Sequence, residues 1–108
     1  MNAKDRAKYR ARAKIMKALG HPARLLIVDE LNKHGERCVC DLTELVGSDM
    51  STVSRHLSQL REAGIVEDDK RGQMVFYRLR VKCLTRLFDC IESVAACNVN
   101  YQLKALTD

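Results

Sequence analysis

The amino-acid sequence predicts a mainly helical domain with one small β-hairpin, its elements following in the order ααααββα. Apolar residues recur at three- and four-residue spacing along most of the chain, which is the period of an amphipathic helix. Aromatic side chains are few, with three Tyr, two Phe and no Trp among 108 residues, so aliphatic side chains must form most of the core. No repeat, linker or low-complexity stretch divides the chain. Residues 1–108 are therefore expected to fold as one domain.

Two helices are expected in the first third of the chain. A basic helix at residues 4–19 ends before Gly20, a residue suited to a left-handed cap. A second helix begins at Pro22, the only proline, because the fixed φ of proline suits the first helical position. Its apolar residues lie on one side and Gly35 ends it, so this helix is expected to be buried on that side.

The third and fourth helices are expected to be joined by a tight turn. The segment "CVCDLTELV" has apolar residues at helical spacing and ends at Gly47. The segment "SDMSTVSRHLSQLREAG" begins at Asp49, a preferred N-cap residue, and ends at Gly64. Two such helices, over about residues 38–64, have the form of a helix-turn-helix, whose second helix reads the major groove of DNA.

A β-hairpin is expected at about residues 65–79. The runs "IVEDD" and "MVFYRL" are rich in β-branched and aromatic residues, and the connection "KRGQ" contains a glycine. Directly after a helix-turn-helix, such a hairpin is typical of a wing. Helical spacing returns over about residues 82–106, which predicts a last helix. The complete pattern is that of a winged helix-turn-helix.

The side of the fourth helix that its apolar residues leave free carries small polar, amide and cationic side chains. Such groups bond to base edges and phosphates. A polar first turn by itself would also serve as a simple helix cap, but here it occurs together with the tight turn and a cationic hairpin tip. His56 has an alternative role, which is packing against the helix pair. The candidate DNA-binding residues are Ser51, Thr52, Ser54, Arg55, His56, Gln59, Lys70 and Arg71.

Positive charge is concentrated at the start of the chain. The net charge is +5, but residues 1–20 hold seven Lys or Arg and one Asp, whereas the rest of the chain holds twelve basic and thirteen acidic side chains. A basic arm of this kind is either a phosphate contact or a solvated helix face. Because the first residues contain no apolar run, neither a secretory signal nor a membrane span is expected, and the protein is expected to be cytoplasmic.

Five cysteines are expected to remain thiols in a reducing compartment, with a role in metal binding, redox sensing or packing. Cys38 and Cys40 are two residues apart, and on a regular helix their side chains would point about 200° apart. If Cys38 is the N-cap of the third helix, its backbone is not helical and the two sulfurs can converge on one soft ion. The alternative is that both are small buried residues.

Three segments, "ERCVCDL", "STVSRHLSQLREAGIV" and "RGQMVFYRL", resemble the ArsR (ArsR/SmtB) family of winged helix-turn-helix, metal-responsive repressors. The resemblance covers roughly residues 10–100. It implies a homodimeric repressor that binds two-fold symmetric, double-stranded operator DNA and leaves it when a metal or metalloid binds. In such a dimer we expect the first helix and the C-terminal dimerisation helix, about residues 82–106, to hold the two chains together. It also implies that Cys38 and Cys40 are metal ligands, with As(III) or Sb(III) as the effector and Cd, Pb or Zn as alternatives.

The sequence departs from the arsenic-sensing members at Thr43, where they usually have a third cysteine. A hydroxyl is a poor ligand for a soft metalloid, so a third sulfur must come from elsewhere. Cys90, then Cys83, and more weakly Cys97 are the candidates, and their alternative role is packing at a dimer seam. The family's other known site, a zinc site on the last helix, is not expected because that helix has no His.

The sequence is also compatible with other functions. A thiol redox or persulfide switch would retain DNA binding and close a disulfide between Cys40 and a cysteine of the last helix. A winged helix that binds only protein would give no salt-dependent DNA binding. A thiol enzyme is disfavoured, because the spacing is C-x-C rather than C-x-x-C and no βαβ pattern surrounds it. The protein is therefore expected not to be an enzyme.

Overall fold

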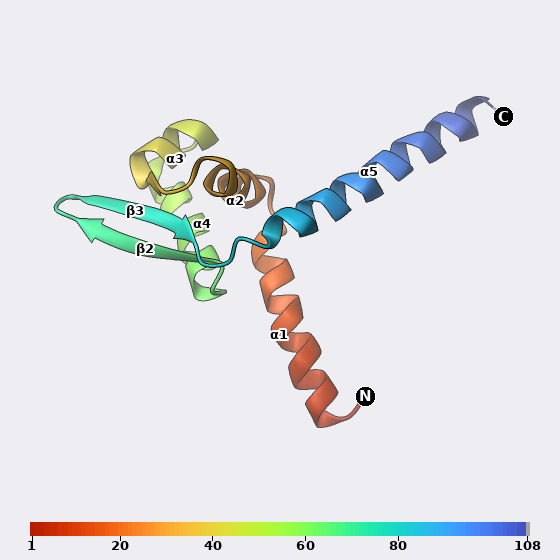
Figure 1. Ribbon diagram of the computed structural model, residues 1–108, viewed down its shortest axis with the longest axis horizontal. Coiled ribbons are helices and arrows are strands. Elements are labelled where there is room, and N and C mark those ends of the chain that lie inside the picture. The colour runs from red at the N-terminus through yellow and green to blue at the C-terminus, as the bar shows by residue number, and fades with distance from the viewer. Residues whose placement is uncertain (108) are drawn as a thin grey trace.

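The computed structural model describes residues 1–107, which form five helices and three strands (Figure 1). The expected order of helices and hairpin strands is confirmed, and a two-residue strand is added between the second and third helices. The elements are α1 (Ala3–Leu19), α2 (Pro22–His34), β1 (Arg37–Cys38), α3 (Val39–Val46), α4 (Met50–Glu62), β2 (Val66–Arg71), β3 (Met74–Leu79) and α5 (Leu84–Thr107).

The three strands form one antiparallel sheet in the order β1-β3-β2. β2 and β3 are the expected hairpin, and Gly72, with a φ of 61°, supplies the positive φ that the tight turn requires. β1 pairs with the other edge of β3 and places Cys38 opposite Phe76. Two residues are too few to show an alternating pattern, so no sequence signal predicts β1. The hairpin is thereby tied to the chain immediately before α3.

The core lies between α2, α3, α4 and the sheet. α3 packs against α4, and both of them pack against α2. The three- and four-residue spacing of apolar positions places the buried side chains of each helix on one face, as expected. Leu42 of α3 meets the buried face of α4 in this cluster. The fully buried side chains are Ile27, Val28, Leu42, Val53, Leu57, Leu60 and Val66.

The helix ends follow most of the expected signals. Gly47 ends α3 in the left-handed conformation, with φ of 76° and ψ of 20°. Asp49 caps α4, and its Oδ1 accepts a hydrogen bond of 2.8 Å from the Thr52 N–H. The expectation for Gly20 is wrong: its φ is −79°, which is not left-handed, and its N–H donates to the carbonyl of Lys17. This tighter last turn leads directly into α2.

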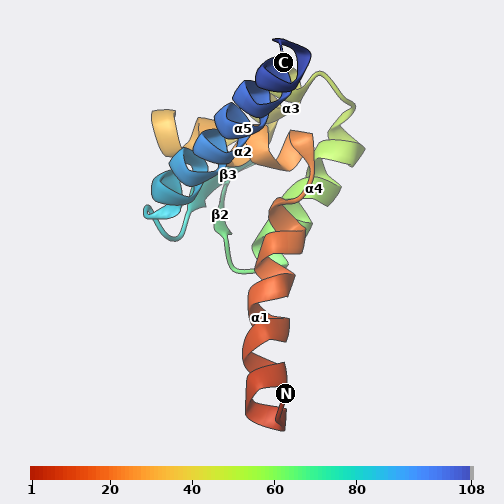
Figure 2. The same ribbon diagram turned by 90° about the vertical axis from the view of Figure 1, so that its right-hand side faces the viewer.

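α1 and α5 project from the core in different directions (Figure 1, Figure 2). The first turns of α5 pack against the core, through Leu84, Leu87 and Phe88. Further along, the apolar side chains are open to solvent, with Val94 60% and Leu103 55% exposed. A single chain therefore leaves a long apolar face of α5 uncovered. None of the helices among residues 1–107 has the length and apolar character to cross a membrane.

Candidate nucleic-acid interface and thiol site

α4 presents one face to the core and the opposite face to solvent. Its start is fixed by Asp49, and the hydrogen bond from the backbone of Thr52 holds the pKa of the Asp49 carboxyl below its usual value. The polar residues expected to read DNA occupy the outward face and its flanks. Of these, Ser51, Arg55 and Gln59 are exposed, whereas Thr52 and Ser54 are partly exposed.

His56 is turned toward α2 instead of outward. Its Nδ1 lies 3.2 Å from Nη1 of Arg24, and its ring centroid lies 4.5 Å from that of His21. Because a guanidinium can only donate, Nδ1 of His56 must accept. Desolvation, followed by the charges of His21, Arg24 and Arg55, lowers the pKa of His56. His56 therefore fits the packing alternative and holds α4 against the start of α2.

The two residues at the hairpin tip have different surroundings. Both are exposed, but Arg71 is also held in place by carboxylates. Nη1 and Nη2 of Arg71 lie 2.6 and 2.9 Å from the two carboxylate oxygens of Glu36, and its Nε donates to Asp69 at 3.0 Å. These hydrogen bonds, first those with Glu36, raise the pKa of Arg71. The guanidinium also stacks over the ring of Phe76, at 4.5 Å.

Glu36 is a residue that the sequence reasoning missed. It lies 35 residues from Arg71 in the chain, and no local motif links the two. Glu36 immediately precedes β1, so its ion pair joins the tip of the hairpin to the segment that leads into the cysteine pair. A second contact, of 3.5 Å from Arg78 to Glu36, adds to this link.

Cys38 is the last residue of β1 and the N-cap of α3, as expected. Its φ of −78° and ψ of 160° are extended, and its Sγ accepts a hydrogen bond of 3.4 Å from the N–H of Asp41. The Cys38 side chain is only 5% exposed, whereas Cys40, in the first turn of α3, is exposed. The helix begins between the two thiols, so regular helical geometry does not force their side chains apart.

The remaining expected ligands are spread along the start and length of α5. Cys83 lies in the turn before α5, and Cys90 and Cys97 are exposed on the helix itself. In the part of the chain that the structure describes, no three His, Cys, Asp or Glu side chains are grouped so as to hold a metal ion. The hydroxyl of Thr43 donates to the carbonyl of Val39 at 2.7 Å, within α3. Among residues 1–107 of one chain, Cys38 and Cys40 thus have no third ligand beside them.

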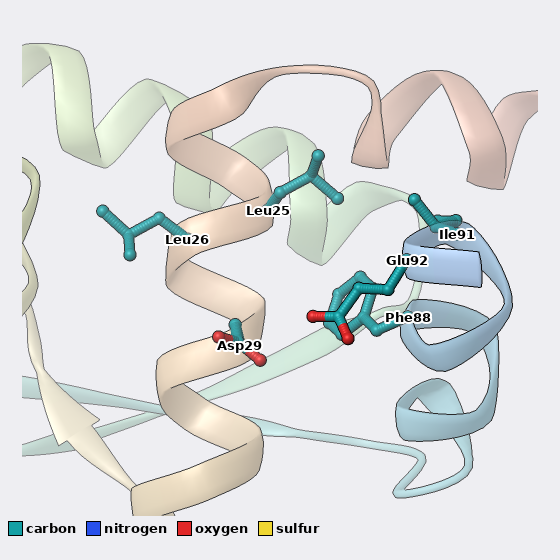
Figure 3. A pocket seen from close by; sticks show the side chains of 6 residues that line it. All are labelled: Leu25, Leu26, Asp29, Phe88, Ile91 and Glu92. Carbon is teal, nitrogen blue, oxygen red and sulfur yellow. The ribbon is translucent and has the colours of Figure 1, made fainter. Parts of the chain in front are cut away.

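A shallow pocket lies between α2 and α5, next to the exposed apolar face of α5. Figure 3 shows Leu25, from α2, and Phe88 and Ile91, from α5, on the two sides of the gap. The pocket has no cysteine in its lining, and it continues the apolar face of α5. Its lining residues are Leu25, Leu26, Asp29, Phe88, Ile91 and Glu92.

Comparison with known proteins agrees with this architecture. The family model described as "Bacterial regulatory protein, arsR family" matches residues 21–68. An uncharacterized HTH-type transcriptional regulator, MJ1325 of Methanocaldococcus jannaschii, is 40% identical over 85 residues, which are 76% of this chain and 96% of that protein. The solution structure of the homodimeric winged helix-turn-helix domain Mb0332 from Mycobacterium bovis has a TM-score of 0.78 and 30% identity, covering 94% of this chain and 93% of that one.

Two further relatives have names that refer to arsenical and cadmium resistance. The arsenical resistance operon repressor of Escherichia coli is 45% identical over 65 residues, and a homologue of the cadmium resistance regulator CadC from Staphylococcus aureus is 40% identical over 67 residues. The matches cover 60% and 62% of this chain. The chain spans only about half the length of these relatives, 56% and 55% respectively.

The fold and these relatives define a winged helix-turn-helix transcriptional regulator, a class of DNA-binding proteins and not of enzymes. The chain belongs to the ArsR family of bacterial regulatory proteins, as the resemblance of its sequence motifs indicates.

The lowered pKa of His56 predicts that folding stability falls as the medium becomes acidic. The unfolded chain takes up a proton near pH 6.5, its unperturbed value, whereas the folded chain resists protonation until a lower pH. The contribution of neutral His56 to the free energy of unfolding is therefore complete above about pH 6.5. It is lost as the pH falls toward the pKa of His56 in the folded chain. Urea unfolding at pH 7.5 and 5.5 should give a smaller pH dependence for His56→Gln than for the wild type. Equal pH dependence in the two proteins would contradict the assignment.

Proposed function

We propose that the protein is a homodimeric ArsR-family repressor that releases its operator when a thiophilic ion coordinates Cys38 and Cys40. The proposed effector is arsenite or antimonite, with Cd, Pb or Zn as alternatives. One observation carries the proposal: the two thiols flank the start of α3, and α3 packs directly against the DNA-reading helix α4. Sensor and reader are therefore consecutive elements in mechanical contact.

DNA binding is assigned to the exposed face of α4 and to the tip of the hairpin. Ser51, Arg55 and Gln59 would approach base edges, and Lys70 would contact a phosphate. A dimer with two such helices would insert them into successive major grooves, about 34 Å apart. Dimerisation is supported by the uncovered apolar face of α5 and by the homodimeric state named for the Mb0332 domain.

The effector is assigned from the chemistry of the donors. Two thiols favour soft ions over magnesium or calcium, and a soft metalloid such as As(III) would need a third sulfur. Cys90, Cys83 or Cys97, from the same chain or its partner, is proposed to supply it. Cys83 is exposed and lies in the turn before α5, so helical geometry does not fix its side chain relative to Cys90 and Cys97. The arsenical and cadmium relatives support this class of effector without choosing within it.

The burial of Cys38 provides a way for ion binding to be coupled to the release of DNA. Cys38 is only 5% exposed, and we propose that an ion that binds its sulfur displaces the end of β1 or the start of α3. Movement of α3 is passed to α4 through the helix packing, and movement of β1 is passed to the wing through its pairing with β3. Because coupling is reciprocal, operator DNA must weaken ion binding by the same factor.

A cysteine double variant tests the sensor. In the wild type, arsenite or cadmium should weaken operator binding by a factor within about 5–150, the usual range of allosteric coupling. Cys38→Ser/Cys40→Ser should bind the operator with unchanged affinity and lose this response, because hydroxyls are poor ligands for soft ions. Fluorescence anisotropy with labelled operator DNA measures both quantities. Release of DNA by the double variant on adding ion would refute the site, and single Ser variants at Cys83, Cys90 and Cys97 would identify the third ligand.

If movement of β1 is passed to the wing, one variant should still bind the ion but lose less operator affinity when it does. Glu36→Gln removes the ion pair that joins Arg71 to the segment before β1. The ion should still bind, as followed by the thiolate-to-metal absorbance band, but the decrease in operator affinity should be smaller than in the wild type. Glu67→Gln is the matched control, because it removes one carboxylate from the hairpin and leaves the Glu36–Arg71 pair intact. An unreduced response in Glu36→Gln would assign all coupling to the packing of α3 on α4.

A second candidate is a thiol redox switch on the same DNA-binding domain, favoured by the exposure of Cys40 and of the three cysteines at and within α5. Two thiols would lose two protons and two electrons to an oxidant, such as a peroxide, and form one disulfide. Mass spectrometry after mild oxidation separates the candidates. The metal proposal expects tight ion binding under reducing conditions and no DNA release by oxidant alone. DNA release together with a disulfide of Cys40 would favour the redox switch.

A further inference from the structure

A groove lies between the last turns of α1 and the second half of α4. Lys14 and Lys17 line it from α1, Arg24 from α2, and Gln59 and Glu62 from α4. Three of these five side chains are cationic and one is anionic. Lys14, Lys17 and Gln59 are partly or fully open to solvent. The groove is therefore an open, basic hollow that shares Gln59 with the proposed DNA-reading face.

The groove and the hairpin lie on different flanks of α4. Figure 1 shows the hairpin extending to the left of α4 and α1 descending to its right. On the hairpin flank, Arg61 pairs with Asp68 of β2 at 2.9 Å. On the other flank, Gln59 lines the groove together with Lys14 and Lys17. A duplex resting on the exposed face of α4 would extend over both flanks, and the wing would cover only one of them.

Arg24 holds the end of α1, the helix that carries the two lysines, close to α4. Its Nε donates to the carbonyl of Ala18 at 2.7 Å, and its Nη1 lies 3.2 Å from Nδ1 of His56 in α4. The guanidinium thus ties the end of α1 to the middle of α4, so Lys14 and Lys17 are held beside the reading helix. The cationic groups of the groove are in this way built into the fold instead of lying on a separate tail.

We propose that this groove binds the phosphate backbone of operator DNA, next to the bases that α4 reads. The proposal rests on the DNA-binding function proposed above and adds the last turns of α1 and the start of α2 to the DNA-binding surface. The charge distribution supports it, because residues 1–20 carry seven basic side chains and one acidic one, while the rest of the chain is almost neutral. Lysines that bind phosphates add affinity that does not depend on base sequence.

Salt dependence of operator binding tests the groove. Binding of the purified protein to a labelled duplex from its own promoter is measured at several concentrations between about 50 and 200 mM KCl. Lys14→Gln/Lys17→Gln should bind more weakly and should reduce the slope of log K against log salt by about 1 for each phosphate that the variant leaves unneutralised. The ratio of operator to non-specific binding should stay the same, because every base-reading side chain is still present. Glu62→Gln should act in the opposite direction, since it removes the one carboxylate of the groove.

Two control variants distinguish the effect of charge in the groove from the effect of the protein's net charge. Lys33→Gln/Lys82→Gln removes the same charge from α2 and from the turn before α5, outside the groove, and should keep the wild-type slope. Lys14→Arg/Lys17→Arg should also keep it. The proposal that the groove binds phosphates would be wrong if Lys14→Gln/Lys17→Gln kept the wild-type slope of log K against log salt. It would also be wrong if Lys33→Gln/Lys82→Gln reduced this slope equally. In both cases the proposed operator binding would stand. No salt-dependent binding by the wild type would overturn the proposed function itself, and the groove with it.

Discussion

The structure depends on a change of backbone conformation at one residue. Cys38 pairs with Phe76 as the last residue of a strand, and the same residue caps the helix that follows. Its sulfur satisfies the N–H of Asp41, one of the otherwise unpaired donors at the start of α3. A side chain that belongs to the sheet and to a helix terminus at once cannot move without disturbing both. This constraint makes a buried cysteine a suitable place for a sensor.

Two kinds of interaction surround α4 and set its position. Apolar packing from α2 and α3 holds its buried face, and polar interactions hold its flanks. His56 meets Arg24 and His21 on one flank, while Arg61 meets Asp68 on the other. α4 is thereby fixed by neighbours that include residues far from it in the chain. Any displacement of α3 acts on an element that has few alternative ways to pack.

The two terminal helices, α1 and α5, differ in the kind of side chains that they expose. α5 has an apolar face that one chain leaves uncovered, which suits a second protein surface. α1 carries seven basic side chains, although it also exposes Tyr9, Ile15 and Met16, and its last turns are held beside α4 by Arg24. The pocket between α2 and α5 continues the apolar face, whereas the groove between α1 and α4 is basic. Protein and nucleic-acid binding are therefore assigned to different sides of the molecule.

The sequence by itself determined the helices, the hairpin, the family and the capping role of Cys38, because these depend on spacing and on cap residues within a few positions. It did not determine β1, which is too short for a pattern, or the conformation of Gly20. Only the tertiary structure decided that Arg71 pairs with Glu36 and that His56 turns toward Arg24. These partners are 35 and 32 residues apart, and such pairs form only after the chain has packed.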